Sequence, residues 1–265
     1  MAQHLDRRTA LALLTAAAAG GAGVFAGCAT RPAGPDPDGL DDLVARHTAA
    51  SGGAAAIEAV QAIEYRLHIT EPTFQVDGTY VTDRRGRMRI DVHADGARVY
   101  TEAWDGRTAW QMGPDGVAKP SAPTGAAALW HGASFPGKLL GLHEMARQGH
   151  VLLRLPAETL DGQRFDVIRL TFSDGFATRL YFDPATHLLA RQRDERALHP
   201  DLDPTKKLLE NRYADWRPVD GVMRSFGGSQ VDAATGAELQ QTHVTSVRSL
   251  VALDDARFAP GAPEA

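Results

Sequence analysis

Seven Asp-Gly dipeptides recur between residues 77 and 221, and they constrain the fold of this chain more than any other feature. They begin at positions 77, 95, 105, 115, 161, 174 and 220. The tight turns of β-hairpins need positive φ angles, which Asp and Gly adopt readily, so Asp-Gly between alternating apolar residues predicts a hairpin. The first dipeptide falls inside an expected strand, where it is a candidate bulge. Repeated hairpins predict an antiparallel sheet and argue against a parallel βαβ fold.

Apolar and polar residues alternate between these turns, as expected of strands with one buried face. The alternation first appears over residues 63–70 and continues over 74–80 and 88–93. Further strands are predicted at 97–103, 107–112, 151–159, 163–172, 176–182, 188–195, 208–216, 221–231 and 238–247. About a dozen consecutive strands with short connections predict one large, curved antiparallel sheet.

Two segments depart from this pattern and have helical spacing instead. In residues 40–62, Leu40, Leu43 and Val44 share a helical face, and Ser51-Gly52-Gly53 separates them from a second short helix. In residues 120–149 the Asp-Gly turns cease, and the apolar residues 139–145 predict a short helix with Ser134 as its N-cap. The predicted fold class is therefore α+β, mostly β, with helices from 40–62 and 124–147 lying against the sheet.

The chain contains one cysteine, Cys28, which excludes an intramolecular disulfide and a multi-cysteine metal site. An Arg7-Arg8 pair and an apolar run over residues 10–25 precede it, a pattern typical of a secretory signal and too short to span a bilayer comfortably. The sequence Phe25-Ala26-Gly27-Cys28 resembles a bacterial lipobox, whose cysteine is lipidated. We therefore expect a signal peptide at 1–27, a lipidated N-terminus and Pro/Gly/Asp-rich tether at 28–39, and a single domain at 40–265.

The same segment indicates where the protein resides. The arginine pair resembles a twin-arginine signal, but Asp6 and Ala10 depart from that motif, so twin-arginine and general secretory export both stay open. Either route exports the protein, and a lipid on Cys28 would anchor it to a membrane. Ala29 stands where Asp would resemble an inner-membrane retention signal, which favours the outer membrane, facing the periplasm.

No motif in the sequence specifies a catalytic, cofactor or metal site. Residues 132–137 resemble a nucleophile elbow, but Pro136 replaces its second glycine and the strand–turn–helix context is missing. His143-Glu144 begins a zinc motif whose second histidine position holds Arg147. No two carboxylates are paired by spacing as acid and base. We therefore expect no catalysis, no metal and no cofactor.

Charge patterning adds little that is specific. A net charge of −5 and an aromatic content of 7% argue against a nucleic-acid binder. The basic cluster at residues 83–89 predicts a solvated turn, which an anionic headgroup or an acidic partner would fit. Residues 191–196 alternate in charge, which suits an exposed strand that forms cross-strand pairs.

Six segments in a characteristic order extend over nearly the whole chain after Cys28. They are Gly52-Gly53 with Ile57, Val60 and Ile63; Gly86 to Asp91; Asp105-Gly106 with Trp110; Asp183 to Thr186; Tyr213 to Trp216 with Val219 to Val222; and Asp254 to Phe258 with Pro260. By their order and spacing they resemble the LolA/LolB-like lipoprotein-carrier superfamily. The resemblance implies an open half-barrel of antiparallel strands whose concave face is covered by helices, leaving an apolar cavity for acyl chains.

This resemblance implies a hydrophobic ligand, either a lipid or the acyl chains of a lipoprotein, bound without catalysis. The residues expected to line the cavity are Tyr65, Leu67, Met88, Ile90, Trp110, Leu139, Leu140, Leu142, Met145, Leu170 and Phe172. The membrane-inserting loop of lipoprotein-accepting members has its nearest counterpart in Leu129-Trp130, which is either such a loop or a lid. Two alternatives remain, an extracytoplasmic hydrolase using carboxylates in the same cleft and an envelope-stress sensor domain. A hydrolase predicts ionisable groups converging in the cavity, whereas a carrier predicts an almost wholly apolar one.

Overall fold

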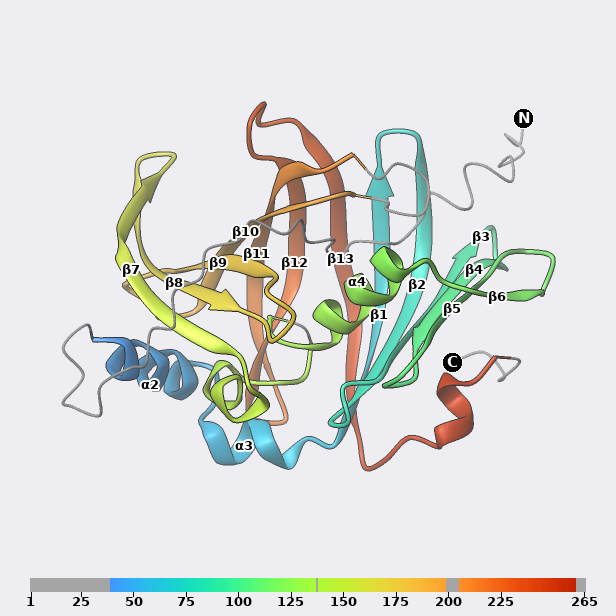
Figure 1. Ribbon diagram of the computed structural model, residues 1–265, viewed down its shortest axis with the longest axis horizontal. Coiled ribbons are helices and arrows are strands. Elements are labelled where there is room, and N and C mark those ends of the chain that lie inside the picture. Colours follow the sequence, from blue (N-terminus) through green and yellow to red (C-terminus); the bar gives the residue numbers. More distant parts are fainter. Residues whose placement is uncertain (1–38, 137, 199–204, 261–265) are drawn as a thin grey trace.

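A computed structural model describes residues 39–136, 138–198 and 205–260, where thirteen strands form one antiparallel sheet (Figure 1). The predicted signal peptide, Cys28 and nearly all of the predicted tether lie outside the described residues. The strands are β1 (Ala62–Glu71), β2 (Phe74–Asp83), β3 (Met88–Ala94), β4 (Ala97–Trp104), β5 (Ala109–Met112), β6 (Ala118–Pro120), β7 (Val151–Leu160), β8 (Gln163–Thr171), β9 (Ala177–Phe182), β10 (Leu189–Arg196), β11 (Lys207–Val219), β12 (Val222–Asp232) and β13 (Glu238–Leu250). The predicted fold class, a mostly β protein with a large antiparallel sheet, is confirmed.

The chain enters the sheet at its centre and leaves it at its centre. Strands β1 to β6 run outward to one edge, the chain then crosses to the opposite edge, and β7 to β13 run back inward until β13 pairs with β1. The edges, β6 and β7, are not paired with each other, so the described sheet is an open half-barrel and not a closed barrel. We call the face under helix α4 (Pro123–Ala133) the concave face, because Figure 1 shows the sheet curving around that helix.

Six of the seven Asp-Gly dipeptides lie in hairpin connections between paired antiparallel strands, as the sequence predicts. Asp95-Gly96, Asp161-Gly162 and Asp220-Gly221 each have positive φ at both residues, for example 50° at Asp95 and 77° at Gly96. The bulge at residues 77–78 is not present, because β1 and β2 pair in continuous register through Gly78. A Cβ at Gly78 would stand 3.1 Å from Leu67 Cδ1, so the glycine leaves room for that side chain on the concave face.

The first helical segment is divided as predicted, into α2 (Leu40–Ala50) and α3 (Ala54–Ala59). The break is a point of close backbone contact, because a Cβ at Gly52 would lie 2.2 Å from the carbonyl oxygen of Gly221. In addition, the Met223 amide donates to the Ser51 carbonyl oxygen at 3.0 Å. The Gly52-Gly53 break therefore attaches the two helices to the β11–β12 turn.

The second helical segment differs from its prediction. Helix α4 forms at the start of the predicted helical region, but residues 139–145 do not form an α-helix. The only helical turns beyond α4 in the described part of this segment are the 3₁₀ turns η1 (Leu142–Glu144) and η2 (Ala146–Gln148). Leu139 and Leu140 are both buried but in different apolar clusters, so their side chains do not share the single apolar face that an amphipathic helix presents. Ser134 ends α4 instead of starting a later helix, and its hydroxyl donates to the Trp130 carbonyl oxygen at 3.2 Å.

On the opposite, convex face, the predicted basic turn is largely buried. The C-terminal 3₁₀ helix η3 (Asp255–Phe258) packs on β3, and Figure 1 shows it beside that end of the sheet. Arg87 bonds Asp83 and Asp255, and its guanidinium lies 4.2 Å from the centre of the Phe258 ring. Arg89 pairs with Asp91 and donates to the Arg257 carbonyl oxygen. The prediction of a solvated turn is wrong here, because a segment distant in sequence covers these side chains.

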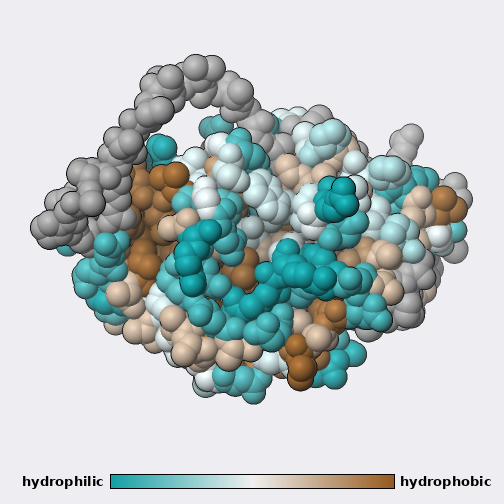
Figure 2. Space-filling model, turned by 60° about the horizontal axis from the view of Figure 1, so that its bottom comes forward, coloured by the Kyte–Doolittle hydropathy of each residue, from teal (hydrophilic) through white to brown (hydrophobic). Residues whose placement is uncertain are grey.

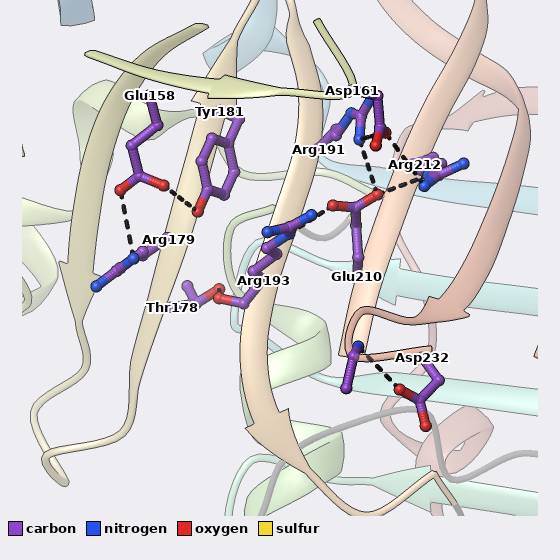
Figure 3. A network of polar contacts seen from close by, with 11 residues as sticks. Glu158, Asp161, Thr178, Arg179, Tyr181, Arg191, Arg193, Glu210, Arg212 and Asp232 are labelled. Carbon is purple, nitrogen blue, oxygen red and sulfur yellow. Dashed lines mark hydrogen bonds and ion pairs between the residues drawn. The ribbon is translucent and has the colours of Figure 1, made fainter. Parts of the chain in front are cut away.

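A second polar cluster on the convex face centres on Glu210 of β11 (Figure 3). Its fully buried carboxylate accepts hydrogen bonds from Arg191 at 3.1 Å, from Arg212 at 2.6 Å, and from Arg193. Asp161 also bonds Arg191 from the β7–β8 turn. The predicted cross-strand charge pairs therefore form, although the carboxylate at their centre is shielded from solvent.

One face of the molecule is polar over most of its visible area (Figure 2). Figure 2 shows this face with hydrophobic residues gathered on its left, the side on which β7 lies in Figure 1. On that edge strand the exposed large hydrophobic residues are Val151 and Leu153.

Candidate ligand-binding cavity

A cavity of about 270 Å³ lies between α4 and the concave face, and its lining crosses the β1–β13 junction at the centre of the sheet. Two separate clusters of buried apolar residues form the core around it. One cluster joins α3, α4 and β1 to β4, and the other joins α2, η1 and β8 to β10. The cavity remains where neither the helices nor the loops fill the concave surface.

One wall of the cavity is apolar and comes from the N-terminal half of the sheet and from α4. Its aliphatic and thioether side chains offer an acyl chain contact area without hydrogen bonds. They are Leu67, Ile69, Met88, Ile90, Ala128 and Leu129, with Val244 of β13 beside them.

The facing wall is polar and comes from β10 to β13. Its polar residues are Gln192, Asp194, Arg196, Asn211, Ser229, Gln230, Gln240 and Thr242. Apart from Ser229, the neighbour of Gln230, they alternate along each strand, so their side chains point to the same face. Polar groups of this kind recognise a ligand by hydrogen bonding and not by shape alone. The lining is therefore amphipathic, in contrast to the almost wholly apolar cavity that a carrier predicts from sequence.

The polar wall is held together by its own hydrogen bonds. Asp194 accepts from Thr178 at 2.9 Å, from Gln192 at 2.9 Å and from Arg196, so both carboxylate oxygens are engaged. Asn211 accepts from Arg196 at 2.9 Å and from Gln230 at 2.8 Å. Two buried atoms of this wall, Arg196 Nε and Gln230 Oε1, lack a partner among the described residues. These atoms are available to a polar ligand group.

A smaller cavity of about 70 Å³ adjoins the first one beneath α2 and the 139–142 segment. The two cavities share Pro136, Lys138, Tyr213 and Ser225 in their linings. The smaller cavity adds His47, Tyr65 and Arg224. These shared residues form the boundary between the two cavities.

No family model and no curated protein matches the sequence, so solved structures provide the comparison. A DUF1329 family protein from Desulfovibrio piger is similar with a TM-score of 0.56 at 12% identity, over 84% of this chain and 98% of that chain. A LolA superfamily protein from Nitrosomonas europaea is similar with a TM-score of 0.53 at 14% identity, over 83% of this chain and 97% of that chain. The chain has a LolA-like fold. At these identities the likeness concerns the fold alone, and it confirms the fold that the sequence resemblance implies.

Within this LolA-like fold, eight of the eleven predicted lining residues border a cavity. Leu67, Met88, Ile90 and Phe172 line the main cavity, and Tyr65, Leu139, Leu140 and Leu142 line the smaller one. Met145 and Leu170 are buried in the apolar cluster under β8 to β10. Trp110 lies on the convex face with Ala103 and donates to the Phe258 carbonyl oxygen at 2.7 Å. Contact between any of these residues and a ligand stays a prediction.

Sequence reasoning missed the polar wall of the LolA-like fold. Gln192, Asp194 and Arg196 recur at the strand period of two, which is the available signal. Arg191 and Arg193, at the alternate positions of the same strand, belong to the convex Glu210 cluster, so both faces of β10 are polar. A strand that is polar on both faces is indistinguishable in sequence from an exposed one.

The described part of the LolA-like fold contains neither a cluster of metal ligands nor a membrane-spanning helix. Nowhere in residues 39–136, 138–198 and 205–260 do three His, Cys, Asp or Glu side chains gather in a way that could hold a metal ion. Among the helices in these ranges, none has the length and apolar character needed to cross a bilayer.

Acidification should destabilise the protein through His47, which lines the smaller cavity. Its Nδ1 bonds the His187 carbonyl oxygen at 2.9 Å, and burial lowers its pKa from 6.5 to about 4. Between those values the unfolded chain binds a proton that the folded protein does not, so stability falls as the pH falls. From pH 7 to pH 4.5 we expect this residue to remove about 2 kcal/mol from the free energy of unfolding. Urea unfolding at a series of pH values measures the effect.

The matched variant is His47→Gln, which keeps a hydrogen-bond donor but does not titrate. Its free energy of unfolding should depend less on pH over the same interval, by about the same 2 kcal/mol. An identical pH dependence in the variant and the wild type would show that His47 is not responsible.

Proposed function

We propose that this protein is an exported, lipid-anchored protein that binds an amphiphilic lipid or the acyl chains of a lipoprotein, without chemistry. The amphipathic cavity between α4 and the sheet carries the proposal. Its apolar wall suits an acyl chain, and its polar wall suits uncharged polar groups of the same molecule. The similarity in fold to a LolA superfamily protein is consistent with this role.

The cellular location rests on the N-terminal sequence. The signal peptide at 1–27 and the lipobox-like Cys28 support export and lipid attachment, with the outer membrane as the favoured destination. A lipid anchor on residue 28 followed by the Pro/Gly/Asp-rich tether would hold the cavity close to a membrane surface, from which a ligand enters.

The cavity offers little support for a hydrolase. Of its two carboxylates, Asp194 has both oxygens engaged by hydrogen bonds and Glu102 accepts from the Tyr100 hydroxyl at 3.3 Å. A carboxylate whose oxygens already accept hydrogen bonds within the protein is poorly placed to exchange a proton with a substrate.

Filling the cavity should abolish ligand binding. Ala128 is fully buried on α4 and lines the main cavity, so Ala128→Phe places an aromatic ring in the space proposed for the ligand. We expect the affinity for a fluorescent fatty acid to fall at least tenfold, which corresponds to about 1.4 kcal/mol. Fluorescence titration of the chain carrying Cys28→Ser, so that no acyl chain is attached there, measures it.

Ala127→Phe is the matched control, since Ala127 is the half-buried neighbour on the same helix and does not line either cavity. It should bind the fatty acid as the wild type does. Ile90→Trp fills the same cavity from the sheet side and guards against a folding defect specific to α4. Native mass spectrometry of the Cys28→Ser chain purified from the periplasm should also show a bound lipid. If no lipid co-purifies and no fatty acid binds, the proposed function is wrong.

A further inference from the structure

Two cationic side chains, Lys138 and Arg224, lie at the boundary between the cavities. Lys138 lines both cavities, and its ammonium lies 5.1 Å from the centre of the Tyr65 ring. Arg224, on β12, lines the smaller cavity and is only 7% exposed. Its Nη1 donates to the Lys138 carbonyl oxygen at 2.6 Å, which places the guanidinium beside the lysine backbone, and its charge is near enough to disfavour the charged form of Lys138.

Neither cation has a carboxylate partner among the described residues. Arg224 Nε and Nη2 are buried without a hydrogen-bond acceptor in the same set. A third cation, Arg84, stands nearby and is already paired with Glu144 at 2.7 Å. The Tyr65 hydroxyl and, more weakly, Asp220 are the groups that favour the charged form of Arg224.

This arrangement is costly for a protein that binds nothing there. Moving a cation out of water without a counter-ion is strongly unfavourable, and buried charges are normally paired. Burial disfavours the charged forms of both groups: it lowers the pKa of Lys138 to about 8 and also lowers the pKa of Arg224. An anion between them would reverse this cost and accept the unused guanidinium N–H groups.

We propose that Lys138 and Arg224 bind the anionic headgroup of the amphiphile, a carboxylate or a phosphate monoester, while its acyl chain extends along the apolar wall of the main cavity. The inference rests on the proposed function and adds the class of ligand to it. The polar wall is a poorer site for the anion, because it contains the carboxylate of Asp194.

The test compares ligands that share an acyl chain and differ in the headgroup. Oleate and 1-oleoyl lysophosphatidate supply the carboxylate and the phosphate, oleyl alcohol supplies the same chain without charge, and inorganic phosphate supplies the anion without the chain. Titration calorimetry uses the full chain carrying Cys28→Ser after removal of bound lipid. We expect tighter binding of oleate or lysophosphatidate than of oleyl alcohol, and the stronger of the two identifies the headgroup.

The variants Lys138→Met and Arg224→Gln should each weaken binding of the preferred anion by about ten- to a hundredfold, the value of a charge-assisted hydrogen bond. Oleyl alcohol should bind as before, which also shows that the variants fold. The matched controls are Lys207→Met and Arg169→Gln, which remove exposed cations from β11 and β8.

The possible failures differ from one another. Equal binding of oleate, lysophosphatidate and oleyl alcohol, unchanged by the two variants, would overturn the anion site and leave the proposed function standing. Binding of none of the three long-chain compounds, and no binding of inorganic phosphate, would overturn both. Binding of inorganic phosphate at the same two residues, with no binding of acyl compounds, would keep the anion site and overturn the lipid ligand.

Discussion

Phe258→Ala should lower the free energy of unfolding by about 3–5 kcal/mol, the cost typical of deleting a buried aromatic ring. Phe258 is fully buried although it lies close to the end of the described chain. Its ring stacks under the Arg87 guanidinium, and its carbonyl oxygen accepts from the Trp110 indole. Loss of the ring would leave a cavity and loosen η3 from the arginines that it covers.

Urea or guanidinium unfolding followed by tryptophan fluorescence measures the change. Val251→Ala is the matched control, because Val251 is in the same C-terminal segment and is 91% exposed. Its effect should stay within about 0.5 kcal/mol, as for most surface substitutions. A Phe258→Ala protein as stable as the control would show that η3 does not contribute to the stability of the sheet.

Glu210→Ala should be comparably destabilising, by about 3–5 kcal/mol, because it removes one member of a buried ion cluster. The carboxylate accepts hydrogen bonds from Arg191, Arg193 and Arg212 (Figure 3). Without it, three guanidinium groups would face one another across β10 and β11, with Asp161 as the remaining nearby partner of two of them. Chemical unfolding again gives the magnitude.

Two further variants separate charge from burial in this cluster. Glu210→Gln keeps the shape and one acceptor, so it should cost less than the alanine variant. Asp161→Asn removes the largely exposed carboxylate of the cluster and should cost less than either Glu210 variant, because solvent screens its ion pairs. If Glu210→Ala and Asp161→Asn had the same small effect, the buried carboxylate would have no special role.

The strands were predictable because their determinants are local. Alternation with a period of two places residues such as Tyr65 and Leu67 on one face, and Asp-Gly sets the turns between neighbours. The pairing of β1 with β13 has no such local signature, because it joins residues such as Ile63 and Ser249 that are far apart in the chain. The resemblance to a known superfamily supplied the architecture that local patterns alone did not.

The errors have a common physical cause in contacts between distant segments. The apolar residues 139–145 resemble a helix, since a short apolar run does not distinguish helix from buried loop. Arg87 and Arg89 resemble a solvated turn until η3 covers them. Lys138 and Arg224 are ordinary surface-type residues in sequence, and the fold alone brings them together.

The central junction of the sheet has a consequence for how the molecule forms. Strands β1 to β6 and β7 to β13 each assemble from hairpins between neighbours. By contrast, β1 can pair with β13 only after the whole intervening chain has been synthesised. Contacts of such long sequence separation carry the largest loop-closure entropy and form slowly. The apolar wall belongs to the first half and most of the polar wall to the second. We therefore expect the nascent chain to have no binding site until this last step of folding, so that a ligand can be captured only by a finished molecule.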